Sequence, residues 1–295
     1  MAHCNSKPPV SLVILAAGLG RRFGGDKQLV SVARTGKPLM YFSVMDAYRL
    51  GVRQLVLVIN HLIEQAILKQ FVPLLPHDLK VSLVQQQVDD LPEGCEAYSR
   101  QKPWGTGHAL WSARDAVPAG CIVINADDYY GPDAMTQLLL HLKHNDGWAL
   151  VSYPLKSTLS DSGEVNRGLC QVTNGSLVTI RECLSIKLEN GGICGEIDGK
   201  SVNLEPKAPV SMNIWAFGSD IFDCLNHGLI EFFSVARDQS QVEFYLPAQV
   251  MVSIKEGRSQ VRVYSTKDKW QGITYPEDLE RLGKIFRPGG DGLDE

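Results

Sequence analysis

The length, composition and charge of the chain are those of a water-soluble globular protein and exclude several classes. Its 295 residues suffice for one large α/β domain or two small ones, and 44% hydrophobic with 21% charged residues is close to the average of such proteins. The net charge of −4 argues against a general nucleic-acid binder, which normally carries a basic excess. Binding of phosphate groups would therefore need a local cluster of cations.

Cysteine spacing and the length of apolar runs exclude further classes. The seven cysteines are scattered and never spaced as Cys-x-x-Cys, which argues against a disulfide framework or a zinc site. No apolar run approaches the ~20 residues of a membrane span. The opening "MAHCNSKPPV" lacks the apolar core of a secretory signal. We therefore expect a cytoplasmic protein with no membrane partner.

Short apolar strands alternate with amphipathic helices through the first half of the chain. The predicted strands are 11–17, 54–60, 81–86, 121–126 and 148–154. The predicted helices are 38–51, 62–72, 105–117 and 133–145. Strands that are apolar on both faces predict an α/β fold with a mostly parallel, doubly wound sheet covered on two sides. Ligands bind at the carboxyl ends of such strands, so the loops after the first and fourth strands lie at the functional edge.

The second half of the chain has a different composition. Residues 161–209 are rich in Gly, Asn and Ser with short alternating runs, which predicts antiparallel hairpins laid over the sheet. A strand followed by a helix is expected over 210–225, a late strand over 259–266 and a terminal helix over 275–286. The tail "RPGGDGLDE" is expected to be disordered.

A glycine-rich, cationic loop follows the first strand in "LVILAAGLGRRFGGDKQLV". Gly18 and Gly20 would let backbone N–H groups approach phosphate oxygens closely, because neither has a Cβ. The cations available to neutralise those oxygens are Arg21, Arg22 and Lys27. Phe23 at the third glycine position excludes a dinucleotide fingerprint, and the Gly-Lys-Ser/Thr ending of a P-loop is missing. An ordinary strand-to-helix turn with solvated cations is the alternative.

The segment "RQKPWGTGHALWSA", residues 100–113, joins a polar loop to a predicted helix. Gly-Thr-Gly before a helix offers free N–H groups and a positive dipole end. The amide of Gln101 carries the paired donor and acceptor that can read a nucleobase edge. His108 has two interpretations, a helix histidine without chemistry and a residue of the site.

Two adjacent aspartates follow the fourth predicted strand in "INADDYYG". Adjacent carboxylates at the end of a buried strand repel each other unless a cation compensates them. A hard cation with oxygen ligands, usually Mg²⁺, is the natural partner, and Asp127 and Asp128 are the candidate metal ligands. A helix N-cap in a surface turn is the alternative for these aspartates.

These segments resemble the nucleotidyltransferases that activate sugar 1-phosphates, the NDP-sugar pyrophosphorylases. The loop matches their L-A-A-G-x-G-x-R motif followed by a lysine, and "GKPLM" at 36–40 matches the next stretch. The form R-F-G-G-D-K-Q is closer to the cytidylyl- and molybdopterin-nucleotidyltransferase branches. The resemblance implies that the loop wraps a triphosphate and that Arg22 and Lys27 are catalytic. The nucleotide-binding residues that it implies in the loop are Leu15, Ala16, Ala17, Gly18, Gly20 and Arg21.

The other two segments carry over in the same way. Residues 100–113 resemble the R-Q-x-x-P-L-G-x-G-H-A stretch of uridylyltransferases, with one residue fewer between Gln and Gly. The resemblance implies that Gln101 and Gly105 face the base, with Thr106 beside them in the nucleotide site. Asp127 matches the catalytic, metal-binding aspartate of the family, and Asp128 is the alternate ligand. A Mg²⁺ cofactor is therefore expected.

Beyond residue 150 the resemblance implies an acceptor site. "EVNRGLCQV" is similar to the segment that passes over the sugar, which implies Gly168, and "VSMNIWAF" to the strand that gives an asparagine to sugar hydroxyls, which implies Asn213. For Asn213 a structural hydrogen-bonding role stays open. The residues that grip the sugar phosphate have two candidate pairs, Glu205 with Lys207 and Arg181 with Glu182. Thr274 stands where the family has its second metal ligand, Asp or Asn.

The resemblance also implies a fold and a reaction. The fold is a Rossmann-like nucleotidyltransferase domain of GT-A type over 1–285, with an antiparallel β insertion over the active site. Its nucleotide-binding half is 1–150, its acceptor-binding half is 151–285, and 286–295 form the tail. The reaction moves a nucleotidyl group from a nucleoside triphosphate, with UTP or another pyrimidine favoured, to a sugar 1-phosphate. The expected partners are these two small molecules, and a homo-oligomer is compatible with the sequence.

Two other functions stay open. One is CTP-dependent cytidylyl transfer to an alditol phosphate or phosphocholine. The other is a non-catalytic regulatory protein that binds nucleotide sugars. The set Gly18, Arg22, Lys27 and Asp127 argues against it, while the absence of a carboxylate at Thr274 keeps it open. A glycosyltransferase of related topology is disfavoured, because its Asp-x-Asp motif is absent and the cationic loop is present.

Overall fold

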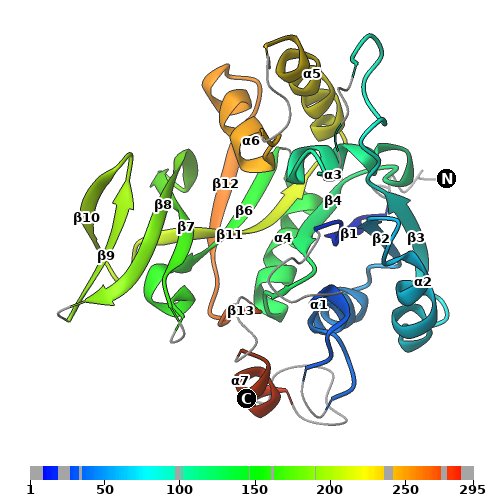
Figure 1. The fold of residues 1–295 in the computed structure, drawn as a ribbon, viewed down its shortest axis with the longest axis horizontal. Helices are drawn as coiled ribbons and strands as arrows, with labels where there is room; N and C mark the ends of the chain where they lie inside the picture. Colours follow the sequence, from blue (N-terminus) through cyan, green and yellow to red (C-terminus); the bar gives the residue numbers. More distant parts are fainter. Residues whose placement is uncertain are drawn as a thin grey trace, which may run out of the picture.

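A mixed β-sheet with helices on both faces forms the centre of the protein (Figure 1). The computed structural model describes residues 9–18, 27–32, 35–96, 100, 102–145, 147–160, 163–189, 191–235, 242–273 and 278–286, and of Lys27 only the backbone. The expected disordered tail lies outside the described residues, apart from Phe286 at its start. Among the described residues no helix has the length and hydropathy needed to cross a membrane. The six described cysteines are all free thiols.

The parallel part of the sheet comes from the first half of the chain. Its strands are β1 (Ser11–Leu15), β2 (Gln54–Ile59), β3 (Lys80–Gln85) and β4 (Cys121–Asn125). They lie in the order β4-β1-β2-β3, and every neighbouring pair is parallel. Leu15 pairs with Asn125 and Ile59 pairs with Gln85, so the carboxyl ends of the four strands meet at one edge. The four strands predicted for this region are confirmed to within two residues at each end.

Antiparallel strands make the sheet mixed rather than mostly parallel, which corrects the sequence prediction. Strand β11 (Pro209–Phe217) is antiparallel to both β4 and β6 (Trp148–Pro154), and β12 (Val261–Ser265) is parallel to β6. The expected hairpins form β7 (Val165–Thr173), β8 (Ser176–Glu189), β9 (Gly192–Ile197) and β10 (Lys200–Leu204). These hairpin strands continue the same sheet through β7 and β8, because β7 pairs with β11 and β8 pairs with β12. They extend to one side of the molecule in Figure 1.

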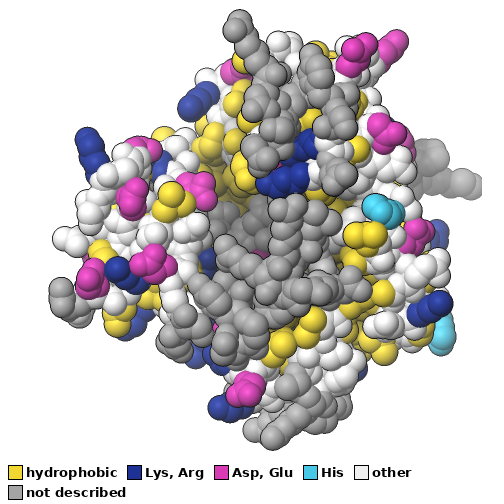
Figure 2. Space-filling model, viewed as in Figure 1, with side chains coloured by type: hydrophobic (Ala, Val, Ile, Leu, Met, Phe, Trp, Pro, Cys, Tyr) yellow, Lys and Arg dark blue, Asp and Glu magenta, His cyan; other side chains and the backbone are white. Residues whose placement is uncertain are grey.

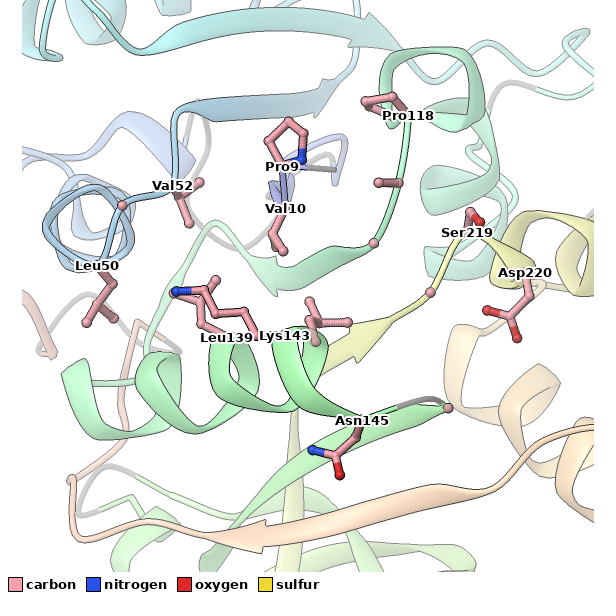
Figure 3. Close-up of a pocket in the computed structure, with 16 residues that line it drawn as sticks. Pro9, Val10, Leu50, Val52, Pro118, Leu139, Lys143, Asn145, Ser219 and Asp220 are labelled. Carbon is pink, nitrogen blue, oxygen red and sulfur yellow. The ribbon is translucent and has the colours of Figure 1, made fainter. Parts of the chain in front are cut away.

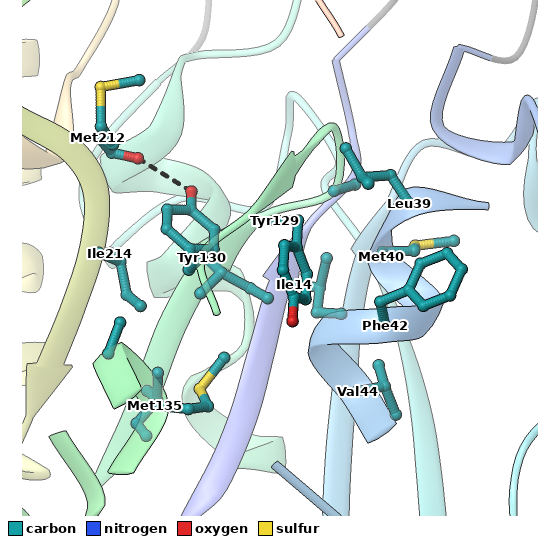
Figure 4. Close-up of a cluster of buried hydrophobic side chains, with 14 of the residues drawn as sticks. Ile14, Leu39, Met40, Phe42, Val44, Tyr129, Tyr130, Met135, Met212 and Ile214 are labelled. Atoms are coloured by element: carbon teal, nitrogen blue, oxygen red, sulfur yellow. Dashed lines mark hydrogen bonds between the residues drawn. The ribbon is translucent and has the colours of Figure 1, made fainter. Parts of the chain in front are cut away.

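The helices bury two separate apolar cores, one on each face of the sheet. Alternate residues of β1 divide between them, with Leu12 and Ile14 in one core and Val13 in the other. Because successive strand side chains point to opposite faces, this alternation explains why the strand is apolar throughout. Helices α1 (Leu39–Arg49), α4 (Pro132–His144) and α7 (Asp278–Ile285) cover the first face, part of which is shown in Figure 4. Helices α3 (Thr106–Ser112), α5 (Asp220–Val235) and α6 (Leu246–Lys255) cover the second.

Three local features differ from the sequence prediction. The helix expected over 62–72 is a single α-turn, α2 (Glu64–Ala66), followed by a π-turn (Ile67–Phe71) and a 3₁₀ turn (Val72–Leu74). Pro73 in the last turn has no N–H to continue the helix. Helix α6 is not among the predicted elements. A small second sheet pairs β5 (Asp128–Tyr129) with β13 (Gln271–Gly272), and it joins the aspartate segment to the late part of the chain.

Candidate active site

A cavity of about 460 Å³ lies at the edge where the parallel strands end. It is bordered by three of the segments that the sequence analysis selected: the end of β1 with its loop, the start of α3, and the end of β4. The residues that line it are Leu15, Ala17, Gly18, Gln86, Lys102, Pro103, Gly105, Thr106, Ala109, Asn125, Asp127 and Glu243. Segments far apart in the sequence therefore meet at one concave site, where α/β sheets bind their ligands.

The described part of the glycine-rich loop is held by two side-chain amides. The Asn60 amide donates to the carbonyl of Ala17 at 3.1 Å, and Gln28 donates to the carbonyl of Gly18 at 2.5 Å. Ala16 is buried, and its backbone N–H donates to Val58. The predicted residues Gly20, Arg21 and Arg22 lie outside the described residues, and so does the side chain of Lys27. The loop thus leaves β1 at the cavity in a fixed conformation as far as Gly18.

Glycine is required where helix α3 begins. Gly105 has φ +102°, a conformation that side chains other than glycine rarely adopt, and a Cβ there would lie 3.0 Å from the carbonyl of Phe244. A Cβ on Gly107 would lie 2.6 Å from the Phe244 ring. The Thr106 hydroxyl accepts from the backbone N–H of Leu246 at 3.0 Å, so it also fixes the start of α6. The Gly-Thr-Gly sequence thus lets α3 pack closely against the segment before α6.

Gln86, which directly follows β3, lines the cavity, while Gln101 lies outside the described residues. The amide nitrogen of Gln86 lies 3.0 Å from the carbonyl oxygen of Gly105 and 3.1 Å from Nδ1 of His108. His108 itself is fully buried, and burial lowers its pKa. His108 does not line the cavity, and its ring contacts the lining residue Gln86.

The two adjacent aspartates have different surroundings. Asp127 lines the cavity. Asp128 is buried, and its Oδ2 accepts from the Asn125 amide at 2.8 Å and from the Tyr130 hydroxyl at 3.1 Å. Burial and the neighbouring Asp127 carboxylate raise the pKa of Asp128 above its usual range. The structure thus separates a carboxylate beside the cavity from a carboxyl group that braces the end of β4.

The predicted acceptor residue Asn213 contacts this end of the cavity. Its side-chain amide donates to Oδ1 of Asn125 at 2.7 Å, and its own oxygen accepts from the Trp215 indole at 2.8 Å. Its φ of 62° lies in the left-handed region, within a register shift of β11 between Ser211 and Trp215. Asn213 is therefore fixed beside a residue that lines the cavity.

Gly168 and Glu182 lie on neighbouring strands near this region. Gly168 pairs with Ser211 of β11 and with Glu182 of β8, and a Cβ on Gly168 would lie 2.7 Å from Ile180. Glu182 is exposed. Burial raises the pKa of the Tyr245 phenol to about 12, with the carboxylates of Glu243 and Glu182 adding to the effect. Glu182 thus lies near the segment that contributes Glu243 to the cavity.

The alternative acceptor pairs differ in their contacts. Arg181 forms an ion pair with Asp198 at 2.8 Å, and both side chains are exposed. Glu205 and Lys207 are exposed in the turn between β10 and β11. Within the part of the chain that the structure describes, Arg181, Glu205 and Lys207 do not line the cavity.

A salt bridge crosses the rim of the cavity. Lys102 pairs with Glu243, and both residues line the cavity. This pair joins the loop before α3 to the segment before α6. On the face shown in Figure 2, acidic and basic side chains of the described residues are interspersed. Lys102 is thus a cation at the cavity that already has a carboxylate partner.

A second cavity, of about 630 Å³, lies at the opposite edge of the sheet (Figure 3). Its lining comes from the residues just before β1, β2, β4 and β6, including Val10, Val52 and Gly120, together with part of α4 and the segment after β11. None of the described residues that the sequence predicts for the site borders it. Although it is larger, it lies away from the carboxyl ends of the parallel strands, so the smaller cavity is the candidate active site.

The residues that border or brace the site without having been predicted from the sequence include Gln28, Asn60, Gln86 and Asn125. Three of them are polar and stand at the end of an apolar strand or directly after it, in "QLVLVIN", "VSLVQQ" and "CIVIN". A polar residue at the carboxyl end of a parallel strand is the signal that could have found them. Gln28 carries no comparable signal, because its contact depends on the fold of its own loop.

Among the described residues, the cavity offers one aspartate as a ligand for a divalent cation. They contain no group of three or more His, Cys, Asp or Glu side chains that could hold a metal ion. Asp127 at the cavity is a hard oxygen donor, and Mg²⁺ is often bound by one or two carboxylates with phosphate and water oxygens completing the shell. Thr274 lies outside the described residues, but Ile273 before it donates its N–H to the Asp127 carbonyl at 3.0 Å. The donor set thus suits a metal that arrives with a phosphorylated substrate.

The sheet with helices on both faces and the cavity at the carboxyl ends of its parallel strands define an α/β fold that binds ligands at this edge. Residues 12–156 match the family model of the MobA-like NTP transferase domain. The matched range contains the glycine-rich loop, the Gly-Thr-Gly segment and both aspartates. Just under half of the chain thus matches this family model, in agreement with the family resemblance seen in the sequence.

Relatives and solved structures extend the similarity to nearly the whole chain. The bifunctional protein GlmU of Thermus thermophilus is 24% identical over 283 residues, which cover 93% of this chain and 51% of the relative. The chain thus spans about half the length of this curated relative. UDP-glucose pyrophosphorylase from Acinetobacter baumanii has a TM-score of 0.58 at 15% identity, with 93% and 92% of the two chains covered. The inositol-1-phosphate CTP transferase from T. maritima has a TM-score of 0.60 at 15% identity, with 93% and 94% covered. These two structures support the Rossmann-like α/β fold.

Proposed function

We propose that the protein transfers a nucleotidyl group from a nucleoside triphosphate to a phosphorylated small molecule and releases pyrophosphate. One observation carries this proposal: Gly18, the Gly105–Thr106 segment and Asp127 border the same cavity although they are far apart in the sequence. Each of them comes from a segment that resembles a nucleotidyltransferase motif, and the NTP transferase domain spans all three.

The reaction needs positioning and charge neutralisation more than acid–base chemistry. A phosphate oxygen of the acceptor attacks the α-phosphorus of the triphosphate, the bond between the α- and β-phosphates breaks, and pyrophosphate leaves. The acceptor phosphate is already ionised at neutral pH, because its second pKa is ~6, so no general base is required. The glycine-rich loop would hold the triphosphate, and Arg22 and Lys27 would neutralise the departing pyrophosphate.

Asp127 is our candidate for holding the divalent cation, with Asp128 as the alternate. A magnesium ion bound there would supply a positive charge close to the α-phosphate and would reduce the repulsion between the two phosphates. Asp127 is favoured as the ligand, because Oδ2 of Asp128 already accepts hydrogen bonds from Asn125 and Tyr130.

The base would be read beside α3. Gln86 and Gly105 both line the cavity, so the Gln86 amide and the backbone N–H of Gly105 can supply the adjacent acceptor and donor that match a pyrimidine edge. Gln86 is a candidate for this role in addition to Gln101. We therefore propose a pyrimidine nucleotide as the donor substrate, with UTP or CTP as the compounds to test.

The acceptor would occupy the side of the cavity near β11. Asn213 is held beside Asn125, and Gly168 and Glu182 lie on the next strands. We therefore propose that the antiparallel strands β7 and β8 cover the acceptor. A sugar 1-phosphate is the favoured acceptor. A second candidate is a polyol phosphate with CTP, because one structural neighbour with a TM-score of 0.60 is an inositol-1-phosphate CTP transferase.

A pyrophosphate-release assay tests the proposal. The four nucleoside triphosphates are combined with sugar 1-phosphates, alditol and inositol phosphates, and phosphocholine, in the presence of Mg²⁺. Release with a pyrimidine nucleotide and a sugar 1-phosphate is the expected result. Release with only CTP and a polyol phosphate or phosphocholine would favour the second candidate. Nucleotide-sugar binding without any release would indicate a regulatory protein instead.

A further inference from the structure

His108 is a fully buried member of α3 that bonds through both of its ring nitrogens. Nδ1 lies 3.1 Å from the amide nitrogen of Gln86, and Nε2 lies 2.7 Å from the backbone oxygen of Asp90. Gln86 continues the chain of contacts to the carbonyl oxygen of Gly105 at 3.0 Å. A hydrogen-bond network of four residues, Gly105–Gln86–His108–Asp90, thus runs from the cavity lining to the loop after β3.

The direction of every hydrogen bond in this network is determined by its two ends. Both ends are backbone carbonyl oxygens, which can only accept hydrogen bonds. The Gln86 atom that faces Gly105 must therefore be the amide nitrogen, whose second hydrogen goes to Nδ1 of His108. Nδ1 then has to be unprotonated, and the proton is on Nε2, which donates to Asp90.

The far end of the network is anchored independently. The Asp90 carboxylate accepts from two nitrogens of Arg114 at 2.9 and 3.0 Å, and the Arg114 guanidinium stacks over the Trp111 ring at 3.7 Å. Trp111 follows His108 in the same helix. The charged groups nearest the ring are thus Asp90 and Arg114, with Arg100 contributing from the preceding loop. The bidentate ion pair holds the Asp90 backbone where it can accept from His108.

We propose that His108 is a positioning residue that locks the amide of Gln86 with its oxygen toward the cavity. With the amide nitrogen occupied on both of its hydrogens, only the oxygen remains to meet a base, and among the described residues it accepts from no donor. The locked acceptor favours bases that present an N–H at this point. The inference rests on the proposed nucleotide site, and it assigns to the buried histidine a role in choosing the base.

The proton position is tested by long-range ¹H–¹⁵N NMR of His108 in the wild-type protein, which needs no substrate. We expect a neutral ring with the proton on Nε2. A ring protonated on Nδ1 would overturn the proposed lock, whether or not the protein has nucleotidyltransferase activity.

The kinetic test uses two variants that each keep one of the two side-chain hydrogen bonds of His108. His108→Asn retains a group near the position of Nδ1, and His108→Gln retains a group near the position of Nε2. Both lose one buried hydrogen bond, so thermal unfolding should show similar destabilisation. With UTP or CTP in the pyrophosphate assay, His108→Gln should raise the KM for the nucleotide about tenfold and change kcat little. His108→Asn should raise the KM much less.

A double-mutant cycle separates positioning from a purely structural role. In a Gln86→Leu background no amide remains to be oriented, so adding His108→Gln should change the nucleotide KM by less than about twofold. An equal rise in KM in both backgrounds would overturn the positioning role while leaving the proposed function intact. Failure of the wild-type protein to bind any nucleotide would instead overturn the proposed function.

Discussion

At the residue scale, Asp127 and Asp128 show how chain neighbours acquire separate roles. The side chain of Asp127 borders the cavity, whereas Asp128 accepts two hydrogen bonds in the interior. Burial disfavours the charged form of a carboxyl group, and a like charge nearby adds to that effect. We therefore propose that Asp127 holds the metal that neutralises a substrate phosphate, and that Asp128 stabilises the end of β4.

Removal of the Asp127 carboxylate tests that division. Asp127→Ala should lower kcat by about a thousandfold, because a charge that acts on the reacting phosphates is lost. The melting temperature should change little, since the side chain borders a cavity. Asp115→Ala, at a side chain that is 93% exposed, is the control and should keep full activity. Near-normal turnover of Asp127→Ala would contradict the assignment.

A second carboxyl group predicts a pH dependence of stability. Asp46 of α1 is buried, and burial raises its pKa from 3.8 to about 6 although Tyr129 and Arg49 act in the opposite direction. The folded state therefore binds this proton more tightly than the unfolded state. Its contribution to stability is present below about pH 4 and is lost as the pH rises toward 6.

The Asp46→Asn variant removes this titration. Relative to the wild-type protein, the free energy of unfolding of the variant should rise by about 2 kcal/mol between pH 4 and pH 7, measured by urea unfolding at both values. The ion pair of Asp46 with Arg49 at 3.3 Å opposes part of the gain. A difference between the two proteins that is the same at both pH values would show that Asp46 does not titrate in this range.

Site residues that belong to a recognisable sequence motif could be predicted. Site residues that are brought there only by the fold could not. Gly18, Gly105 and Asp127 come from recognisable patterns and line the cavity. Gln86 does not, because the nineteen residues between β3 and the Gly-Thr-Gly segment hide its closeness to Gly105. The role of His108 depends on that same contact, so it could not be assigned from spacing.

At the element scale, strand β11 is bent where it reaches the cavity. Asn213 takes a left-handed conformation at the register shift, and its side chain spans from Asn125 of β4 to Trp215 of its own strand. Asn is one of the few residues besides glycine that tolerates this region of φ and ψ. The identity of the residue thus serves both the backbone bend and the contact beside the proposed acceptor site.

Two substitutions separate these contributions. Asn213→Gly keeps the backbone conformation and removes the amide, whereas Asn213→Ala removes the amide and strains the backbone. Both should raise the KM for the acceptor by about tenfold. Asn213→Ala should in addition be less stable than Asn213→Gly by about 1 kcal/mol, measured by thermal unfolding. Acceptor KM values equal to that of the wild-type protein would remove Asn213 from the proposed site.

The elements of the first half could be predicted well, because their apolar periodicity reflects burial on both faces of one sheet. The mixed character of the sheet could not, since β11 reads as a buried strand whichever direction it runs. Helix α6 was missed because its apolar positions do not stand out from those around it. The break after α2 depends on Pro73, a signal that was present but was not used.

At the scale of the whole molecule, the proposed nucleotide and acceptor sites draw on strands of one sheet. In our proposal β1 to β4 supply the nucleotide side of the cavity, and β11, whose Asn213 contacts the lining residue Asn125, supplies the acceptor side. Ligands that bind only the folded state raise its stability through mass action. Binding to both sites should therefore protect the entire fold.

This gives a measurable effect of ligand and metal removal. A nucleoside triphosphate with Mg²⁺ at about one hundred times its Kd should add about 2.7 kcal/mol and raise the melting temperature by several degrees. Addition of EDTA should reverse most of that rise. The Asp127→Ala variant, measured in parallel, should respond less to Mg²⁺. A shift that persists unchanged in EDTA would contradict a metal-dependent mode of nucleotide binding.

We propose that the protein cleaves a nucleoside triphosphate between its α- and β-phosphates and transfers the nucleotidyl group to an acceptor. The most direct measurement follows UTP or CTP labelled at the α-phosphorus in the presence of Mg²⁺ and a sugar 1-phosphate. We predict that the label enters an acceptor-linked product, with one pyrophosphate released for each product formed, and that Asp127→Ala abolishes both. Label that stays in the triphosphate with every acceptor tested, or that appears only as free monophosphate, would contradict the account.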